Sequence, residues 1–477
     1  MATGRFVDYL ERDAQNQGLA LRFTFTPHPL VGNYFFLRQY LEGNDPTTGR
    51  PIMEGVIDAL TRPVPPAAER KPEVPKPRRA RLLEPDSEEN LQRLFIENGW
   101  TDGLPIVLPT EERVADMLRG TSHPPDEVVG RMTITTLQEK LEYTVEKVAI
   151  NAVMAGAGPE HFPVILALAE MEEPSMPSST TSFARMMVVN GPIRHEIGMN
   201  CGVGALSPFN LANAVIGRAW TLITINLGDS RVGETFMGSQ GNNTNYNNMC
   251  CAENEERSVW EPFHVEKGFR ADESVVSVFR GWSVINSMGA PNQRGAHEET
   301  AIFMKSFAAL RSSATLVMDP LVAKGLKENH GFKTKSDLRH WLSKNVKITA
   351  KQYWDTDINR AFFITEAEHG VEPFATWWKL PPDELFAPFV EPENINFVVV
   401  GGETNPLWQT TDLWHVKSAS IDKWRPRKPI PAKVRMPVPP VDILCSDGTC
   451  EEPATSASAG CSDGSCESPP KGKGGPQ

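Results

Sequence analysis

Met187-Val-Val-Asn-Gly-Pro192 is an apolar run that predicts a buried strand, and the glycine-rich loop Met199-Asn-Cys-Gly-Val-Gly204 follows it. A helix is expected after this loop, because Ser207 is a suitable N-cap and Pro208 suits the first helical position. Apolar residues then recur at helical spacing as far as Ile223. This strand, loop and helix form the clearest local pattern in the chain.

Helices and apolar strands alternate on both sides of this unit. Further helices are expected at 87–96 with Ser87 as N-cap, and at 144–155, 159–171 and 333–342. Buried strands are expected at Ala314-Thr-Leu-Val-Met318 and Asn396-Phe-Val-Val-Val-Gly-Gly402. The alternation predicts the α/β class, a mixed sheet with flanking helices, and leaves the strand order open.

Changes in composition divide the chain into four parts. Residues 1–61 are expected to form a small N-terminal unit, and 62–85 a linker rich in proline and basic residues. The main α/β domain is expected at 86–424. The remainder, 425–477, is rich in proline, contains four cysteines and is predicted to be a flexible tail, with disorder expected over 441–477 in the absence of a ligand.

Charge and hydropathy exclude several classes of function. The 477 residues carry a net charge of −12, which argues against a general nucleic-acid-binding protein. No run approaches the roughly 18 apolar residues that cross a bilayer, and the N-terminus lacks the pattern of a secretory signal. We therefore expect a cytoplasmic protein that acts on a small-molecule substrate, with no nucleic-acid or membrane partner. The cysteines would remain reduced there.

The glycine-rich loop contains the first candidate reactive group. Helix N-termini bind anions and lower the pKa of nearby thiols, so Cys201 is a candidate nucleophile or metal ligand, with His195 as its base or proton donor. The residues that would shape an anion-binding wall are Asn190, Gly191, Gly202 and Gly204. The plainer alternative is a buried, inert cysteine beside flexible glycines.

A polar tract at 238–256 contains the second group of candidates. Cys250 and Cys251 are adjacent, so on a strand their side chains would point to opposite faces, and Cys251 is the candidate nucleophile or ligand of the pair. Glu253 and Glu255 would share one face and act as general acid and base, or bind a hard metal. His264 is a candidate proton carrier. Solvated surface carboxylates and a structural histidine are the plainer alternatives.

The tail repeats one hexapeptide pattern, as Cys445-Ser-Asp-Gly-Thr-Cys450 and Cys461-Ser-Asp-Gly-Ser-Cys466. Ser-Asp-Gly favours a tight turn that brings the two thiols of each unit together. The four thiolates of Cys445, Cys450, Cys461 and Cys466 would bind one soft transition metal, or each pair would cycle between dithiol and disulfide. The four-residue spacing is wider than that of a usual zinc site. A tail without function is the plainer alternative.

Several long strings resemble a family of poorly characterised bacterial proteins that are associated with small thiol or selenol proteins of the U-G-S-C type. They are Gly99-Trp-Thr-Asp-Gly-Leu-Pro-Ile-Val-Leu-Pro-Thr-Glu-Glu-Arg113, Thr144-Val-Glu-Lys-Val-Ala-Ile-Asn-Ala-Val-Met-Ala-Gly156, Asn190-Gly-Pro-Ile-Arg194, Ala212-Asn-Ala-Val-Ile-Gly-Arg-Ala219 and Ala252-Glu-Asn-Glu-Glu256. The resemblance covers roughly residues 90–420. It implies a cytoplasmic bacterial protein with thiol-linked chemistry and a thiol or selenol partner protein, and it supplies no reaction.

The chain departs from the family pattern in one loop. The family tends towards Gly-Ala-Gly-Ala-Leu-Gly-Pro-Gly, whereas this sequence reads Cys201-Gly-Val-Gly-Ala-Leu-Ser-Pro-Phe209. A role for Cys201 that is shared by the whole family is therefore in doubt, and the cysteine-containing tail is an addition.

Two functions of different classes are consistent with these patterns. The first is an enzyme of small-molecule metabolism, a thiol- or metal-dependent oxidoreductase or lyase, in a redox or carbon–heteroatom bond-cleaving step. The tail would deliver reducing equivalents or a soft metal to it. The alternative is a protein that binds and delivers a soft metal or metalloid without turnover. A third, weaker interpretation is a scaffold subunit for a separate thiol partner.

Overall fold

The computed structural model describes residues 22–26, 42–63, 81–132, 141–287, 289, 295–428 and 430, together with Ala2, Thr3, Val7, Leu10 and Ala14. Among these residues, no helix combines the length and the apolar character that crossing a membrane requires. The chain divides into two units, Met1–Pro439 and Pro440–Gln477, and the second lies outside the described residues.

The first of two four-stranded sheets has the strand order β14-β7-β5-β6. Its strands are β5 (Ala184–Asn190), β6 (Cys250–Ala252), β7 (Val275–Gly281) and β14 (Trp414–Ser420). β5 pairs in parallel with β6, with Met187 opposite Cys250, and antiparallel with β7. β14 is antiparallel to β7. The predicted strand at 187–192 is therefore the central strand β5.

The second sheet has the order β12-β9-β13-β8. Its strands are β8 (Val284–Asn286), β9 (Ala314–Met318), β12 (Ile395–Val399) and β13 (Trp408–Thr411). β12 runs parallel to β9, whereas β13 is antiparallel to both β9 and β8. Each sheet therefore contains one parallel pair within an otherwise antiparallel arrangement, which confirms the predicted mixed α/β class.

The two sheets pack against each other through alternate residues of their strands. Met186 and Val188 of β5 share one buried cluster with Val317 of β9 and Val398 of β12. The residues between them face the other way, because successive side chains of a strand point to opposite faces. Met187, for example, belongs to a different cluster on the outer face of the first sheet.

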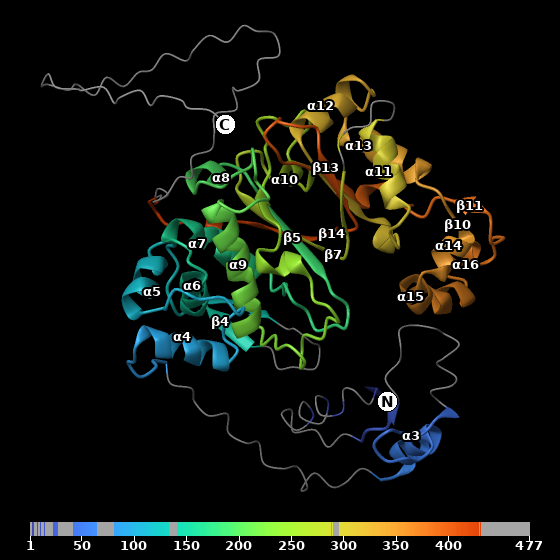
Figure 1. Cartoon of the computed structure of the whole chain (residues 1–477), viewed down its shortest axis with the longest axis horizontal. Coiled ribbons are helices and arrows are strands. Elements are labelled where there is room, and N and C mark those ends of the chain that lie inside the picture. Colours follow the sequence, from blue (N-terminus) through green and yellow to red (C-terminus); the bar gives the residue numbers. More distant parts are fainter. Residues whose placement is uncertain are drawn as a thin grey trace, which may run out of the picture. The chain divides into compact units, whose positions relative to one another are not determined.

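Helices cover the outer face of each sheet. The first sheet is covered by α6 (Val145–Met154), α7 (Phe162–Glu170) and α9 (Leu211–Asn226). The second is covered by α11 (Ala296–Met304), α12 (Pro320–Glu328) and α13 (Lys335–Asn345). The order is therefore helices, sheet, sheet, helices, with the two helical groups on opposite sides (Figure 1).

Smaller elements complete the described chain. An aromatic cluster joins β10 (Ile348–Thr349) and β11 (Leu385–Phe386) to α14 (Ala350–Asp355), α15 (Asp357–Glu368) and α16 (Phe374–Trp378). The rest are β1 (Ala2–Thr3), β2 (Phe25–Thr26), α3 (Ile52–Thr61), α4 (Glu88–Glu97), α5 (Glu111–Leu118), β3 (Val128–Met132), β4 (Leu141–Thr144), α8 (Ile193–Glu196) and α10 (Phe263–Glu266). Short 3-10 turns are η3 (Pro159–His161), η4 (Asn243–Tyr246), η5 (Leu310–Ser312), η6 (Pro392–Asn394) and η7 (Asp422–Trp424).

Capping residues fix several helix boundaries. Ser87 accepts a hydrogen bond from the backbone of Asn90, as expected of the N-cap of α4. The predicted start of α9 at Ser207 is wrong, because α9 begins at Leu211 after Asn210. Phe209 has a φ of +79°, a left-handed conformation that a right-handed helix cannot contain, so the helix starts only beyond it.

The four-part division expected from composition stays a prediction. At the boundary expected between residues 424 and 425, however, the chain continues to make contacts with the main domain. Arg425, the first residue of the expected tail, hydrogen-bonds to Glu196 of α8 and to Ser274.

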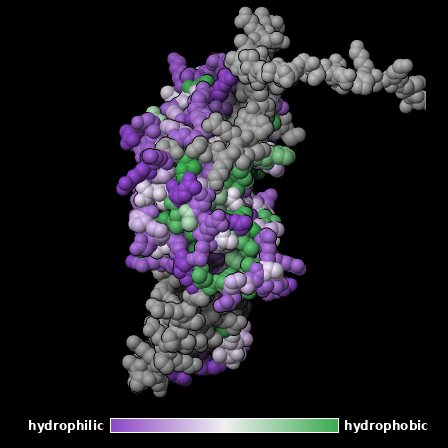
Figure 2. Space-filling model, turned by 90° about the vertical axis from the view of Figure 1, so that its left-hand side faces the viewer, coloured by the Kyte–Doolittle hydropathy of each residue, from purple (hydrophilic) through white to green (hydrophobic). Residues whose placement is uncertain are grey.

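On the face shown in Figure 2, hydrophilic residues predominate and hydrophobic ones form smaller patches between them.

Candidate functional site

The carboxyl ends of the parallel strands of both sheets meet at one place. The backbone of Asn254, just after β6, donates to the oxygen of Val399 in β12 at 2.7 Å, and its side chain donates to Gly401 at 2.9 Å. Gly401 in turn donates to the backbone oxygen of Cys201 at 3.0 Å. Binding sites favour this edge of α/β sheets. We call the cluster of Asn190, Gly191, Arg194, His195, Cys201, Glu253, Glu255, Glu256 and His264 the carboxyl-end site.

Glu253 and Glu255 form the buried floor of this site. Glu253 accepts hydrogen bonds from the side chain of Asn190 at 2.6 Å and from the backbone of Phe263 at 2.7 Å. Glu255 accepts from the same Asn190 amide at 2.9 Å and from the backbone of Gly191 at 2.7 Å. Because Glu253 is fully buried and its oxygens are engaged, it holds the strand ends together and does not reach a substrate.

A second layer of buried charges lies behind Glu253. The ammonium of Lys335 lies 3.9 Å from Glu253 and 3.4 Å from Glu266, which also pairs with Arg339. Burial alone would raise the pKa of Glu266, but the charges of Lys335 and Arg339 outweigh it and hold that pKa below its usual range. The buried carboxylates are therefore compensated by cations, as buried charges must be.

Arg194 connects the floor to the surface. Its guanidinium donates to the backbone oxygens of Gly191 at 2.9 Å and Glu253 at 2.6 Å, and to the carboxylate of Glu256 at 2.9 Å. It also lies 3.1 Å from Glu255. Burial opposes its charge, but these carboxylates raise the pKa of Arg194, so the cation is fixed within the site.

The exposed rim of the site contains Cys201, His195 and Glu256. Burial, with help from the charge of Glu256, raises the pKa of the Cys201 thiol, while the charge of the neighbouring Arg194 opposes the rise. His195 makes a 2.9 Å hydrogen bond with Glu256. Despite the opposing effect of burial, the bonds from Arg194 and His195 lower the pKa of Glu256 to about 2. Glu256 is therefore negatively charged at neutral pH.

His264 lies beneath the rim. It is fully buried on α10, and its Nδ1 atom lies 4.0 Å from Glu255. Neither ring nitrogen has a hydrogen-bond partner among the residues that the structure describes. The sequence prediction of a proton carrier thus falls on a histidine that belongs to the site but has no access to solvent.

Cys250 and Cys251 point to opposite faces of β6, as the alternation of a strand predicts. Cys250 lies in the core under α9, and Cys251 lies between the two sheets. Burial raises the pKa of Cys250 well above its ordinary value, and burial together with the nearby charge of Glu253 raises that of Cys251 to about 12. Neither thiol is therefore poised to react in the folded chain.

The glycine-rich loop is filled by its own asparagine side chains. Gly202 donates its backbone N–H to Asn200, and Asn200 donates to Asn210. Asn210 donates to the backbone oxygen of Gly204 at 2.7 Å, and Ser207 donates to the same oxygen. Since the amides of Gly202 and Ser207 are occupied within the loop, these two donors are not free for an anion, and the anion-binding wall stays a prediction.

The predicted metal ligands of the tail, Cys445, Cys450, Cys461 and Cys466, lie outside the described residues. Within the part of the chain that the structure does describe, no group of three or more His, Cys, Asp or Glu side chains is arranged to hold a metal ion.

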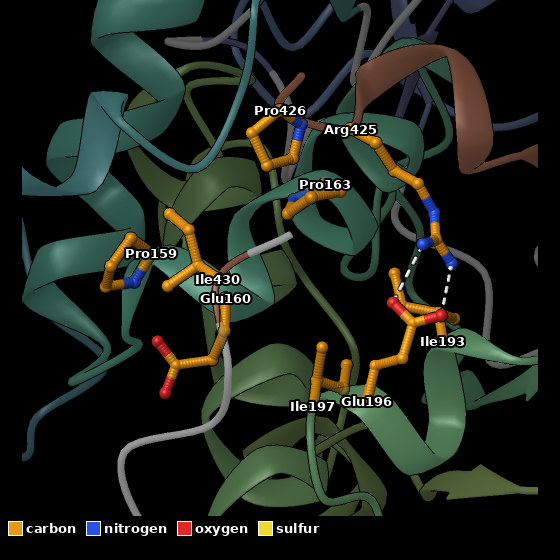
Figure 3. Close-up of a pocket in the computed structure, with 9 residues that line it drawn as sticks. All are labelled: Pro159, Glu160, Pro163, Ile193, Glu196, Ile197, Arg425, Pro426 and Ile430. Carbon is orange, nitrogen blue, oxygen red and sulfur yellow. Dashed lines mark hydrogen bonds and ion pairs between the residues drawn. The ribbon is translucent and has the colours of Figure 1, made fainter. Parts of the chain in front are cut away.

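Arg425 and Ile430, which are among the last described residues, pack near α8. Arg425 reaches across to Glu196, with hydrogen bonds of 2.8 and 3.3 Å, and Ile430 lies close to Pro159 (Figure 3). The cavity that remains holds about 30 Å³, roughly the space of one water molecule. This contact fixes the short helix that carries Arg194 and His195.

Sequence reasoning identified most of the site but missed Arg194 and the pairing of Glu256. Arg194 directly precedes His195 in the turn that follows Pro192, and nothing local marks it as buried. A buried arginine becomes recognisable only once the acidic residues that surround it are known. Comparisons with protein families, with curated proteins and with solved structures found no match for this chain, so the case for its function rests on the geometry of the carboxyl-end site.

Proposed function

We propose that this chain is a thiol-dependent enzyme of small-molecule metabolism, with Cys201 as the reactive group of the carboxyl-end site. The reaction would be a redox step or the cleavage of a carbon–heteroatom bond. One observation carries the proposal: Cys201 is the only partly exposed cysteine among those described, and its thiol lies beside the fixed cation of Arg194. The resemblance to thiol-associated bacterial proteins supports the same class and a cytoplasmic location.

In the bond-cleaving reaction, Cys201 would lose its proton and its sulfur would attack carbon. A carbon–sulfur bond forms as the bond from carbon to the heteroatom breaks, and the proton passes to the leaving heteroatom. His195 is the proposed proton carrier, because it hydrogen-bonds to Glu256, whose charge acts on the thiol. Arg194 would stabilise the thiolate, since a nearby cation favours the charged form.

In the redox reaction, the tail would supply the electrons. Two thiols of one hexapeptide would become a disulfide, and the substrate would take up the two electrons and two protons that they release. A small thiol or selenol partner protein would then reduce that disulfide. Both roles rest on the sequence alone.

The rate of alkylation by iodoacetamide, followed separately for each cysteine peptide by mass spectrometry, tests the proposal on the anaerobic full-length chain. We expect Cys201 to react well before Cys250 and Cys251. Glu256→Gln removes a charge that raises the pKa of the Cys201 thiol, so alkylation of Cys201 at pH 8 should become severalfold faster.

Glu393→Gln is the matched control, because Glu393 is an exposed glutamate whose ion pair is with Arg339. It should leave the alkylation of Cys201 unchanged. A Cys201 thiol that reacts no faster than Cys250, or that does not respond to Glu256→Gln, would refute the proposed reactive centre. Cys201→Ser should also abolish any covalent adduct that mass spectrometry finds on the peptide containing residue 201 after the chain is incubated with bacterial small-molecule extracts.

A further inference from the structure

The asparagine-rich turn η4 stands between two hollows in the surface. One has a volume of about 750 Å³ and is bordered by the end of α9 and by Tyr246. The other, of about 560 Å³, is bordered by Trp282 and Gln409. Both are within the size range of small-molecule sites. Asn242 and Asn243 line both hollows, so an elongated ligand laid across the turn would enter both.

The described residues that line these hollows carry no free charge. None of those around the second hollow is charged. In the first, Asp102 is held by Arg218 at 2.8 Å, Arg231 is paired with Asp229 at 3.2 Å, and Glu234 is also engaged. An ionic ligand would therefore find no unpaired counter-charge here, which favours a neutral ligand.

Several polar groups that border the hollows lack partners. The side-chain amides of Gln240 and Asn243 make no hydrogen bond to any residue that the structure describes. Around the second hollow, Oε1 of Gln409 and Nε1 of Trp282 are buried and unpaired within the described part of the chain. These two atoms have no accessible surface and stay out of reach of a ligand, whereas the exposed amides of Gln240 and Asn243 are free to bond the hydroxyl groups of a ligand in place of water.

Aromatic side chains border both hollows. Tyr246, with 62% of its surface exposed, borders the first hollow, and Trp282 borders the second. An exposed aromatic ring offers a flat apolar surface beside the amides. A purely apolar ligand would leave the amides unsatisfied, so the ligand must combine an apolar face with many hydroxyl groups.

We propose that the η4 turn is a binding site for a neutral carbohydrate, with one sugar ring in each hollow. A sugar ring has one apolar C–H face for Tyr246 or Trp282. Its hydroxyl groups both donate and accept, which matches the carbonyl and NH2 ends of the Asn and Gln side chains. The site does not depend on the thiol chemistry, because no member of the carboxyl-end site, Cys201 included, borders either hollow.

Titration of the full-length chain with maltotriose, cellotriose and triglycine, followed by saturation-transfer NMR, tests this proposal. We expect at least one trisaccharide to bind. Tyr246→Ala and Asn243→Ala should each weaken that binding about tenfold, the effect of one lost contact worth about 1.4 kcal/mol. Both side chains are exposed, so the variants should fold normally, which circular dichroism would verify.

Phe362→Ala is the control variant, because Phe362 is a similarly exposed aromatic residue on α15, with 60% of its surface accessible. It should bind the trisaccharide as the unaltered chain does. The proposal is overturned if neither trisaccharide binds, if binding persists unchanged in both site variants, or if triglycine binds more tightly than either sugar.

Discussion

Glu253→Gln separates a structural role of this residue from a catalytic one. The substitution preserves the shape of the side chain and removes its charge. In the structure, one carboxylate oxygen accepts bonds from Asn190 at 2.6 Å and Phe263 at 2.7 Å. The other faces the backbone N–H of Val399 at 3.5 Å and the ammonium of Lys335 at 3.9 Å. These contacts join β5, β6, α10, β12 and α13.

The expected loss of stability follows from these contacts. Bonds to a charged acceptor contribute about 1.5–3 kcal/mol and bonds to a neutral one about 0.5–1.5 kcal/mol, so the two short bonds lose roughly 1 kcal/mol each. The new NH2 group faces two donors: the N–H of Val399 loses its acceptor, and Lys335 keeps only Glu266 as a partner among the described residues, at a further cost of about 1–2 kcal/mol. The free energy of unfolding should therefore fall by about 3–4 kcal/mol.

Urea unfolding followed by tryptophan fluorescence measures this loss. Glu393→Gln is the control, because its carboxylate is 70% exposed and its pairing with Arg339 should contribute less than about 1 kcal/mol. If Glu253→Gln lowers stability by no more than this control does, the reasoning fails and Glu253 is free for another role. The alkylation rate of Cys201, measured in the Glu253→Gln variant, shows independently whether the carboxyl-end site is still intact.

Three further outcomes are expected. The pKa of His415 is lowered to about 4 by burial and by the charge of Lys267, so as the pH falls the unfolded chain binds a proton at this residue before the folded chain does. The free energy of unfolding should therefore fall by about 3 kcal/mol between pH 6.5 and 4, and His415→Gln should remove this dependence in urea unfolding at several pH values. Gly191→Ala should lower the thermal unfolding temperature more than Gly233→Ala. Both glycines have a φ of +82°, but only at Gly191 would the added Cβ lie 2.2 Å from a backbone oxygen, that of Glu273. Equal shifts of the unfolding temperature in the two variants would contradict this clash. Ending the chain at Pro440 should remove any soft metal found by elemental analysis of the full chain, and metal retained by the shorter chain would rule out the tail as its ligand.

Local patterns predicted much of the fold. Continuous apolar runs identified β5, β9 and β12, and the cap at Ser87 marked the start of α4. The strand period also placed Cys250 and Cys251 on opposite faces. In each case the deciding interaction lies within a few residues of the pattern, so the sequence contains the necessary information.

Interactions between distant segments could not be predicted in this way. Ser207 resembles an N-cap, but the asparagine side chains of its loop and the left-handed Phe209 delay the helix. Two sheets in place of one, and the meeting of their strand ends, depend on pairings that span most of the chain. Asn190 and Glu253 were both named as candidates, yet their direct hydrogen bond follows only from the parallel pairing of β5 with β6.

The place of β14 in the first sheet has a consequence for the newly made chain. β14 pairs with β7, and through it completes the sheet that contains β6, but it is the last to be synthesised of the strands that the structure describes. Such long-range pairing folds slowly, and Cys250 and Cys251 remain accessible thiols until the sheet has formed. An oxidant therefore meets a different set of reactive sulfurs before and after folding. A sulfenic acid found on Cys250 or Cys251 would record oxidation that preceded folding, whereas one on Cys201, which is accessible both before and after folding, would not distinguish the two stages.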